Sequence, residues 1–367
     1  MSSDFVVIGA GIAGASIAGQ LAAHGKVTLL ETEKNPGFHA TGRSAAYYAP
    51  SYGNDVVRGI TVASEAFFRE PKSRFSTAQL LKPRPSIFVA DKDQTNSFKA
   101  FMDENPNLKR LDSKDLRLQV PLLKPGILVQ GAMDTVGGDL DVDAILQGFL
   151  RQFLEFGGVL HVNAKVQGLI YQDGFWQIDT DAGHFSAPII VNAAGAWADQ
   201  LAELAGLKGL GLQALKRTAI LVDGVDNIAN WPLVVDVDET FYFKPDAGQL
   251  LLSPADESPS APCDAFAEEI TIAITVDRIQ KVLDIEVRKV NHSWAGLRTF
   301  SPDKTFIVGF DPRCEGFFWL AGQGGYGVQT CPALADIAAH QITGSHNIVS
   351  SEEVEKYNTA MQPERFL

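Results

Sequence analysis

The chain has 367 residues, 46% of them hydrophobic, which is enough to bury one large core or two adjoining ones. Lysine and arginine total 31 against 44 aspartates and glutamates, so the net charge of -13 argues against nucleic-acid partners and an anionic membrane surface. Three widely spaced cysteines form no CxxC pair, so neither a disulfide scaffold nor a metal site is expected. This composition predicts a globular protein of the reducing cytoplasm.

The first thirty-one residues carry a dinucleotide-binding pattern, in which an apolar run meets a GxGxxG turn and the next apolar run ends at Glu31. Gly9 allows the tight turn, Gly11 lets backbone N–H groups approach a pyrophosphate, and Gly14 lets a helix pack on the strand. Glu31 is placed to accept hydrogen bonds from an adenosine ribose. A secretory signal peptide is the alternative, but the basic start that it needs is missing. No other apolar run is long enough to span a membrane.

Apolar periodicity and turn residues predict the elements that follow, in chain order. First come a loop at 35–42, a helix at 54–68 and a mixture of short strands and turns at 75–138, expected to belong to another domain. A helix from Asp141 to the Gly157-Gly158 stop precedes short strands at 159–162, 166–171, 176–180 and 189–192. A helix at 198–204 and a glycine-rich loop at 206–211 come next. An antiparallel sheet is predicted at 218–254, with a hairpin turn at 245–248. The last predicted elements are a strand at 317–320 and a helix at 329–340.

Two further strand–turn–helix units follow the fingerprint, and the position of the fingerprint at the N-terminus together with the second of these units near the C-terminus favours FAD over NAD. One turn is NAAGAW at 192–197, and the other is GQGGYG at 322–327, close to the C-terminus. A flavin dinucleotide extends across the whole fold and needs both ends of such a chain, and a helix N-terminus there would stabilise the negative charge of reduced flavin. A tight helix entry without a ligand is the alternative. No second fingerprint is present, which argues against a reductase that also binds NADPH.

Six motifs spread over nearly the whole chain resemble one family of flavoproteins. They are VIGAGIAGAS, HATGRSAAYY, VNAAGAW, FYFKPDAG, WAGLRTF and GQGGYGVQT. Together they resemble the FAD-dependent enzymes of the D-amino-acid oxidase and glycine oxidase superfamily, and most of all its bacterial D-arginine dehydrogenases. The resemblance implies FAD as cofactor and the oxidative deamination of D-amino acids.

The fold class that the resemblance implies is α/β, or α+β overall. A Rossmann-like FAD-binding domain would comprise residues 1–74, 139–215 and 296–367. A discontinuous substrate domain built on an antiparallel sheet would comprise residues 75–138 and 216–295.

The resemblance also implies the residues that bind the amino acid: Tyr52, Arg217, Tyr242, Arg298 and Gly325. The two arginines would hold the carboxylate, the two tyrosines would lie beside it, and the carbonyl of the glycine would lie near the amino group. An amino acid must be held by its carboxylate so that its Cα–H points at flavin N5, and a planar guanidinium grips a carboxylate at two points. Hydride transfer to N5 then yields an imino acid, which water converts to a 2-oxo acid and ammonia.

The residues themselves leave other readings open. Arg217 adjoins Lys216 and would equally suit a solvated face, while Tyr242 would suit a half-buried sheet. His39 would either touch the flavin or only pack.

The cofactor residues that follow from the glycine turns and the resemblance are Gly9, Gly11, Gly14, Glu31, Arg43, Ser44, Ala45, Ala194, Gly195, Trp197, Gly324, Gly325, Tyr326 and Gly327. The segment 322–330 contains no cysteine, so we expect non-covalent FAD.

The sequence departs from the D-arginine dehydrogenases around the substrate side chain. Those enzymes carry an acid after a Pro-Arg-Pro stretch, but here Ser86 follows it; Tyr47 replaces a histidine and Ala49 a threonine. Loss of one charge-assisted contact of about 1.5 to 3 kcal/mol shifts preference by one to two decades. We therefore expect Tyr47 and Ser86 to border a neutral or apolar side chain.

Three alternatives remain at this point: a related secondary amine as substrate, a glycine or sarcosine oxidase that uses oxygen, and a flavin-binding protein without amine turnover. The electron acceptor is either a quinone or oxygen. We expect a cytoplasmic enzyme, and contact with the inner membrane to reach a quinone stays open.

Overall fold

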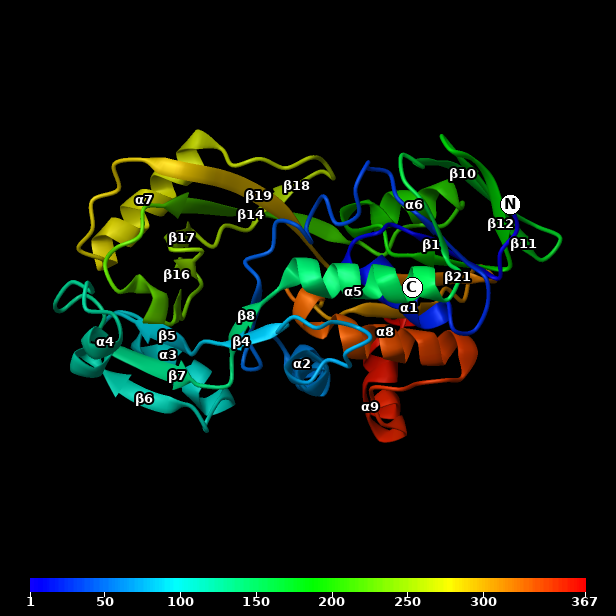
Figure 1. Cartoon of the computed structure of the whole chain (residues 1–367). Coiled ribbons are helices and arrows are strands. Elements are labelled where there is room, and N and C mark those ends of the chain that lie inside the picture. The colour runs from blue at the N-terminus through cyan, green and yellow to red at the C-terminus, as the bar shows by residue number, and fades with distance from the viewer.

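The computed structural model describes residues 1–367, apart from the side chains at positions 351 and 354. Two large sheets dominate the two lobes seen in Figure 1, one around β1 and β21 and the other around β14 to β17. Among the described residues, no helix has both the length and the apolar character needed to cross a bilayer.

The sheet that carries the fingerprint has six strands. Its order is β20 (Ile307–Phe310), β21 (Phe317–Ala321), β13 (Ile189–Asn192), β1 (Phe5–Ile8), β2 (Val27–Leu30) and β9 (Val159–His161). β1 pairs in parallel with both β2 and β13 and is buried on both faces, which explains its uninterrupted apolar sequence. The carboxyl end of β1, where the glycine turn begins, therefore lies at the centre of the sheet.

Helices cover one face of this sheet and a smaller sheet covers the other. α1 (Ile12–Leu21) packs against α5 (Val142–Glu155) and α8 (Gly327–Thr343), while α2 (Asp55–Arg69) packs on α8. The opposite face buries Val6 and Ile8 together with Trp176 of the three-stranded sheet β10 (Val166–Gln172), β11 (Phe175–Thr180) and β12 (Gly183–Ala187). α6 (Ala198–Leu204) and α9 (Ser351–Met361) complete this lobe.

The second large sheet has nine strands. Its order is β18 (Ser258–Ser260), β14 (Gln213–Val222), β17 (Gln249–Ser253), β16 (Tyr242–Asp246), β15 (Leu233–Asp236), β5 (Ser86–Ala90), β7 (Gln130–Asp134) and β6 (Lys109–Asp112), with β19 (Val290–Phe300) also paired to β14. α3 (Thr95–Glu104), α4 (Ser113–Gln119) and α7 (Glu269–Val282) belong to this lobe. A small sheet of β3 (Tyr47–Tyr48), β8 (Gly138–Leu140) and β4 (Leu81–Pro83) lies between the lobes.

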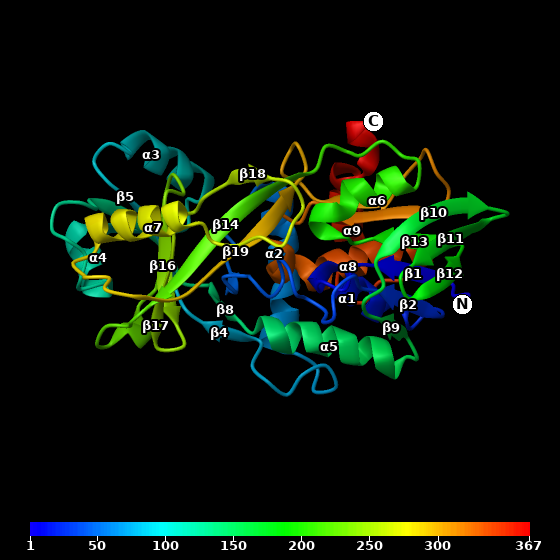
Figure 2. The same ribbon diagram turned by 90° about the horizontal axis from the view of Figure 1, so that it is seen from above.

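β14 and β19 connect the lobes as one long antiparallel pair, which Figure 2 shows running from the second sheet toward the first. All strands of the six-stranded sheet fall within the ranges predicted for the FAD domain. The predicted boundaries at 215/216 and 295/296 cut through β14 and β19. The exact domain limits stay a prediction.

Most predicted elements are confirmed within a residue or two, but several predictions differ from the structure. β14 begins at Gln213, earlier than expected, and α8 runs from Gly327 to Thr343, where Gly344 adopts a left-handed conformation (φ +78°) and ends the helix. α7 was not predicted because its isoleucines, threonines and valines favour strands, and only packing on β14 and β17 makes this segment helical. β12 was also missed, and the prediction of only short strands and turns at 75–138 is wrong, because α3 and α4 lie in this range.

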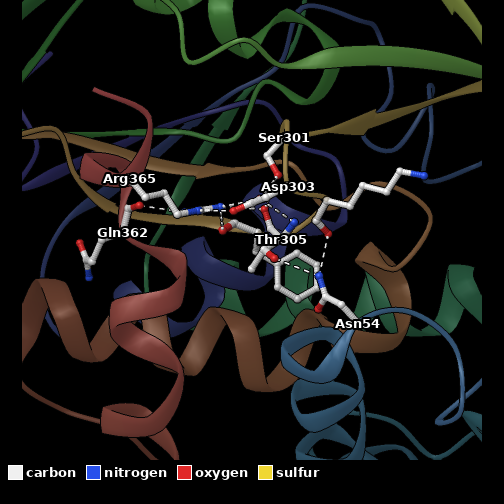
Figure 3. Close-up of polar contacts among 8 residues, drawn as sticks. Asn54, Ser301, Asp303, Thr305, Gln362 and Arg365 are labelled. Atoms are coloured by element: carbon white, nitrogen blue, oxygen red, sulfur yellow. Dashed lines mark hydrogen bonds and ion pairs between the residues drawn. The ribbon is translucent and has the colours of Figure 1, made fainter. Parts of the chain in front are cut away.

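The C-terminal tail is tied to the turn at 301–305 (Figure 3). Asp303 accepts hydrogen bonds from Arg365 Nε at 2.8 Å, from Ser301 Oγ at 2.8 Å and from the Thr305 N–H at 2.9 Å. Asn54, which caps α2, donates from Nδ2 to Thr305 Oγ1 at 2.9 Å. The tail, the turn and the start of α2 therefore form one polar network.

This network predicts a pH-dependent contribution to stability. Burial raises the pKa of Asp303, but the hydrogen bonds from Arg365, Thr305 and Ser301 outweigh it and lower the pKa below its ordinary value of 3.8. A carboxyl group with a lowered folded-state pKa stabilises the fold above its unfolded pKa and loses that contribution as the pH falls through the folded value. We expect Asp303→Asn to have a lower Tm than wild type at about pH 7 and the two Tm values to converge near about pH 2. Asp277→Asn, at an exposed pair with Lys281, is the control and should change nothing.

Candidate cofactor and substrate site

A cavity of about 470 Å³ reaches from the glycine turn of the first sheet to β14, β16 and β19 of the second. Most of the predicted site residues line it: Gly9, Gly11, Glu31, Arg43, Ser44, Ala45, Ala194, Gly195, Trp197, Arg217, Tyr242, Arg298, Gly324, Gly325 and Gly327. Five do not line it: Gly14, Tyr47, Tyr52, Ser86 and Tyr326.

The glycine turn is shaped by close backbone contacts. Gly9 has φ +102°, and a Cβ there would lie 2.5 Å from the carbonyl oxygen of Ala193. A Cβ on Gly14 would lie 1.7 Å from the carbonyl oxygen of Gly9, which explains its place behind the cavity. α1 follows its N-cap Gly11, which has no side chain to cap the helix. The Ile12 N–H donates to Thr41 Oγ1 at 2.9 Å, so the other N–H groups of this turn are the ones available to a pyrophosphate.

Glu31 lies in the cavity wall at the end near the glycine turn. Its carboxylate accepts hydrogen bonds from the N–H of Ala10 at 2.7 Å and of Glu33 at 2.9 Å. Burial raises the pKa of Glu31, although these two N–H groups work in the opposite direction. A carboxylate has about four acceptor positions, so two remain for a ribose.

Arg43 connects the loop after β2 to the second lobe. Its guanidinium donates to the carbonyl oxygens of Ala265 at 2.6 Å and Ala295 at 3.1 Å and pairs with Asp264. Protein groups therefore take up the guanidinium. Only the backbone and the methylene groups of Arg43 remain for the predicted contact with the cofactor.

Four buried polar atoms in the cavity wall have no hydrogen-bond partner within the described part of the chain. They are His39 Nδ1, Arg298 Nη1, Thr299 Oγ1 and Gln323 Nε2. Buried polar groups without partners are rare in folded proteins, so these atoms point to a polar ligand. A flavin dinucleotide carries the ring, ribityl and phosphate groups that such atoms need, and the cavity therefore fits FAD.

Thr299 and Gln323 were missed by the sequence analysis. Both lie inside motifs that were recognised, WAGLRTF and GQGGYGVQT. Their position next to assigned residues was the available signal, but which residues of a motif face a cavity depends on the fold.

The glycine loop before α8 packs directly on Arg298. A Cβ on Gly325 would lie 2.9 Å from Arg298 Cζ, and one on Gly324, at φ +52°, would lie 2.2 Å from the ring of Phe300. Tyr326 packs beside Tyr52 with ring centroids 5.2 Å apart, and burial raises its pKa to about 12. Tyr326 therefore packs outside the cavity wall, at the end of the cavity near Arg298.

The two predicted arginines share one face of the β14–β19 pair but differ in their partners. In the register, Arg217 lies opposite Gly296 and Arg298 opposite Leu215, so the arginines are diagonal neighbours. Arg217, 7% exposed, donates from Nε to the carbonyl of Asp256 at 2.9 Å and from Nη2 to Glu257 at 3.0 Å. The solvated-face reading of Arg217 is therefore wrong.

Arg298 has no hydrogen bond or ion pair to any residue that the structure describes. Burial lowers the pKa of its guanidinium, but the neighbouring Tyr52, Tyr242 and Glu239 outweigh this and raise it. Arg298 is thus a charged and unpaired group beside the cavity, and it requires an anion.

Two carboxylates near this end had no signal in the sequence. Glu257 pairs with Arg217, and Glu239 accepts a hydrogen bond from the hydroxyl of Tyr52 at 2.9 Å. Glu239 lies in the turn between β15 and β16 at φ +55°. Burial raises the pKa of Tyr52, so its hydroxyl stays protonated and donates. Neither acid belongs to a recognised motif, so only the fold reveals them.

Tyr47 and Ser86 lie away from the cavity wall. The hydroxyl of Tyr47 donates to the carbonyl of Arg84 at 2.6 Å, and its ring packs with Ala219, Leu233 and Tyr242. Ser86 Oγ is buried without a described partner. Neither residue lies in the cavity wall. They would therefore affect a substrate only through the residues that lie between them and the cavity.

The sequence profile of the family described as FAD dependent oxidoreductase, or DAO, matches residues 4–341 of this chain. The chain belongs to this family. FAD is its cofactor, and it is an FAD-dependent oxidoreductase with a small-molecule substrate.

Individual members of the DAO family are distant relatives. The chain is 24% identical to FAD-dependent oxidoreductase domain-containing protein 1 of Xenopus laevis, covering 93% of this chain and 79% of that protein. It is 23% identical to mitochondrial sarcosine dehydrogenase of Mus musculus over 70% of this chain, but it spans only 30% of that protein. The crystal structure of L-proline dehydrogenase from P. horikoshii is similar with a TM-score of 0.83 at 21% identity, over 100% of this chain and 98% of that one. At this identity the structural likeness shows the fold, and a mixed α/β FAD-binding fold is confirmed.

Proposed function

We propose that this oxidoreductase catalyses the oxidative deamination of amino acids, and specifically of D-amino acids with neutral or apolar side chains. The α carbon would lose a hydride to flavin N5 and the nitrogen a proton, and water would convert the imino acid to a 2-oxo acid and ammonia. The observation that carries the proposal is the buried Nη1 group of Arg298 at the cavity wall, which has no hydrogen-bond partner among the described residues.

Arg298 would bind the substrate carboxylate, with Tyr242 from β16 beside it and Arg217 as a second donor. When bound, FAD supplies the hydride acceptor. Gly325 packs on the guanidinium, so its carbonyl is our candidate for the contact to the amino group. Tyr52 would act from behind through its hydrogen bond to Glu239. These residues orient the amino acid and exclude water from it.

The preference for neutral side chains is supported by the cavity wall. Of the described residues that line the cavity, only Glu31 and Glu33 are acidic, and both lie at the glycine-turn end. Ala45, Ala219 and Tyr242 line the other end and belong to one apolar cluster. A cationic side chain would find no carboxylate in the cavity wall at this end. Preference for the D isomer rests on the resemblance alone.

A second candidate is amine oxidation of the glycine or sarcosine type with oxygen as acceptor. The similarity to a protein described as sarcosine dehydrogenase supports the amine substrate of this candidate, while oxygen as acceptor is part of the proposal alone. In either case we propose non-covalent FAD, a quinone or oxygen as electron acceptor, and action in the cytoplasm, with contact to the inner membrane if the acceptor is a quinone.

Anaerobic mixing tests the proposal. The purified yellow protein is mixed with D- and L-leucine, D- and L-methionine, D-arginine, glycine and sarcosine, and the flavin band near ~450 nm is followed. We expect D-leucine and D-methionine to bleach the band fastest, with D-arginine slower. Fast bleaching by sarcosine alone favours the second candidate, and an unbleached flavin with every amine contradicts both.

A further inference from the structure

The two arginines at the substrate end are not equivalent, because the segment between β17 and β18 neutralises one of them. The carbonyl of Asp256 and the carboxylate of Glu257 take the Nε and Nη2 donors of Arg217. A guanidinium can bind a carboxylate through two parallel hydrogen bonds, and Nε and Nη2 form one edge that can do so. Three N–H groups of Arg217 remain for a ligand, two on Nη1 and one on Nη2, but Glu257 already balances the charge of the guanidinium.

This arrangement is built into the segment. The carboxylate of Asp256 accepts from the Thr218 N–H at 2.6 Å and from the Thr218 hydroxyl at 2.9 Å, which fixes the segment on β14. Glu257 has a side chain 33% exposed, does not line the cavity, and its second oxygen lies 3.7 Å from Lys304 Nζ. Glu257 therefore acts on the cavity through Arg217.

We infer that Glu257 is a positioning residue that limits the substrate to one carboxylate; this inference rests on the proposed function. With Arg217 paired to Glu257, Arg298 is the arginine at this end that has no ion pair within the described part of the chain. One α-carboxylate occupies it, and a second carboxylate on the substrate would meet a guanidinium whose charge Glu257 already balances and whose Nε–Nη2 edge is taken. The enzyme thereby favours neutral amino acids over aspartate, glutamate and iminodicarboxylates.

The test compares two unreactive anions that differ by one carboxylate, propionate and succinate, bound to the FAD-loaded enzyme. Binding perturbs the flavin absorbance, so dissociation constants are obtained without turnover. We expect wild type to prefer propionate. In Glu257→Gln, no carboxylate balances the charge of Arg217, so the relative affinity for succinate should rise by about tenfold or more, the scale of one charge-assisted contact.

Three variants act as controls. Glu268→Gln removes a carboxylate that pairs with Lys216 in the same region, and Lys304→Gln removes the ammonium near Glu257; both should keep the wild-type ratio. In Glu257→Gln/Arg217→Met the gain should vanish. The FAD content of each variant shows that the site is intact.

The outcomes separate the inference from the proposed function. The inference is overturned if Glu257→Gln has the wild-type ratio of succinate to propionate affinity, or if the gain in succinate affinity persists in Glu257→Gln/Arg217→Met. In both cases the carboxylate site at Arg298 stands. An enzyme whose flavin responds to neither anion contradicts the proposed function itself.

Discussion

Replacing Arg298 with methionine should lower kcat/KM for the amino acid substrate by about 10²- to 10³-fold while the purified protein stays yellow. Truncating one partner of a buried, hydrogen-bonded charge pair costs about 2 to 5 kcal/mol, and each 1.4 kcal/mol is about tenfold. FAD should be retained, because the fingerprint and the pyrophosphate turn lie at the other end of the cavity. Single-turnover flavin reduction and the FAD-to-protein absorbance ratio measure the two effects separately.

The same variant distinguishes a functional arginine from a structural one. The guanidinium of Arg298 is buried and lacks a described partner, so its removal relieves a desolvation cost, and the substrate-free Tm should equal or exceed that of wild type. Arg217→Met is the matched comparison. It leaves Glu257 without its ion pair and should lower the Tm. An Arg298→Met protein that unfolds or loses its flavin would show that this arginine supports the fold instead.

Replacing Gly14 with alanine should weaken FAD binding at least about tenfold, because overpacking of this kind costs about 1 to 3 kcal/mol or more. The new Cβ would lie 1.7 Å from the carbonyl oxygen of Gly9. α1 must then move away from the turn, and its N–H groups move away from the pyrophosphate. Fluorescence titration of the apoprotein with FAD measures the dissociation constant.

Gly19→Ala is the control for this substitution. Gly19 lies on the same helix, but its added Cβ would meet its nearest atom, the carbonyl oxygen of Phe149, at 3.2 Å. The helix can adjust by a few tenths of an ångström without disturbing the turn, so FAD affinity should stay at the wild-type value. Equal weakening in both variants would contradict the role assigned to Gly14.

Local patterns were sufficient wherever a motif describes its own backbone. The turn after β1 and the cap of α5 at Asp141 depend on residues close together in sequence. α7 shows the limit, because its β-branched residues favour a strand and packing on β14 and β17 overrides them. The same limit applies to Tyr47 and Ser86, because the sequence around them did not indicate whether their side chains face the cavity or lie behind its wall.

The amino-acid sequence alone was enough to establish the dinucleotide fingerprint, the FAD cofactor and most elements, since glycine spacing and apolar periodicity are local properties that one chain segment carries by itself. Only the tertiary structure decided that Arg298 is unpaired while Arg217 is neutralised by Glu257, and that Glu239 accepts from Tyr52. The physical reason is that charge, burial and pairing depend on groups up to 187 positions apart in the sequence, which only the packing of β14, β16 and β19 brings together.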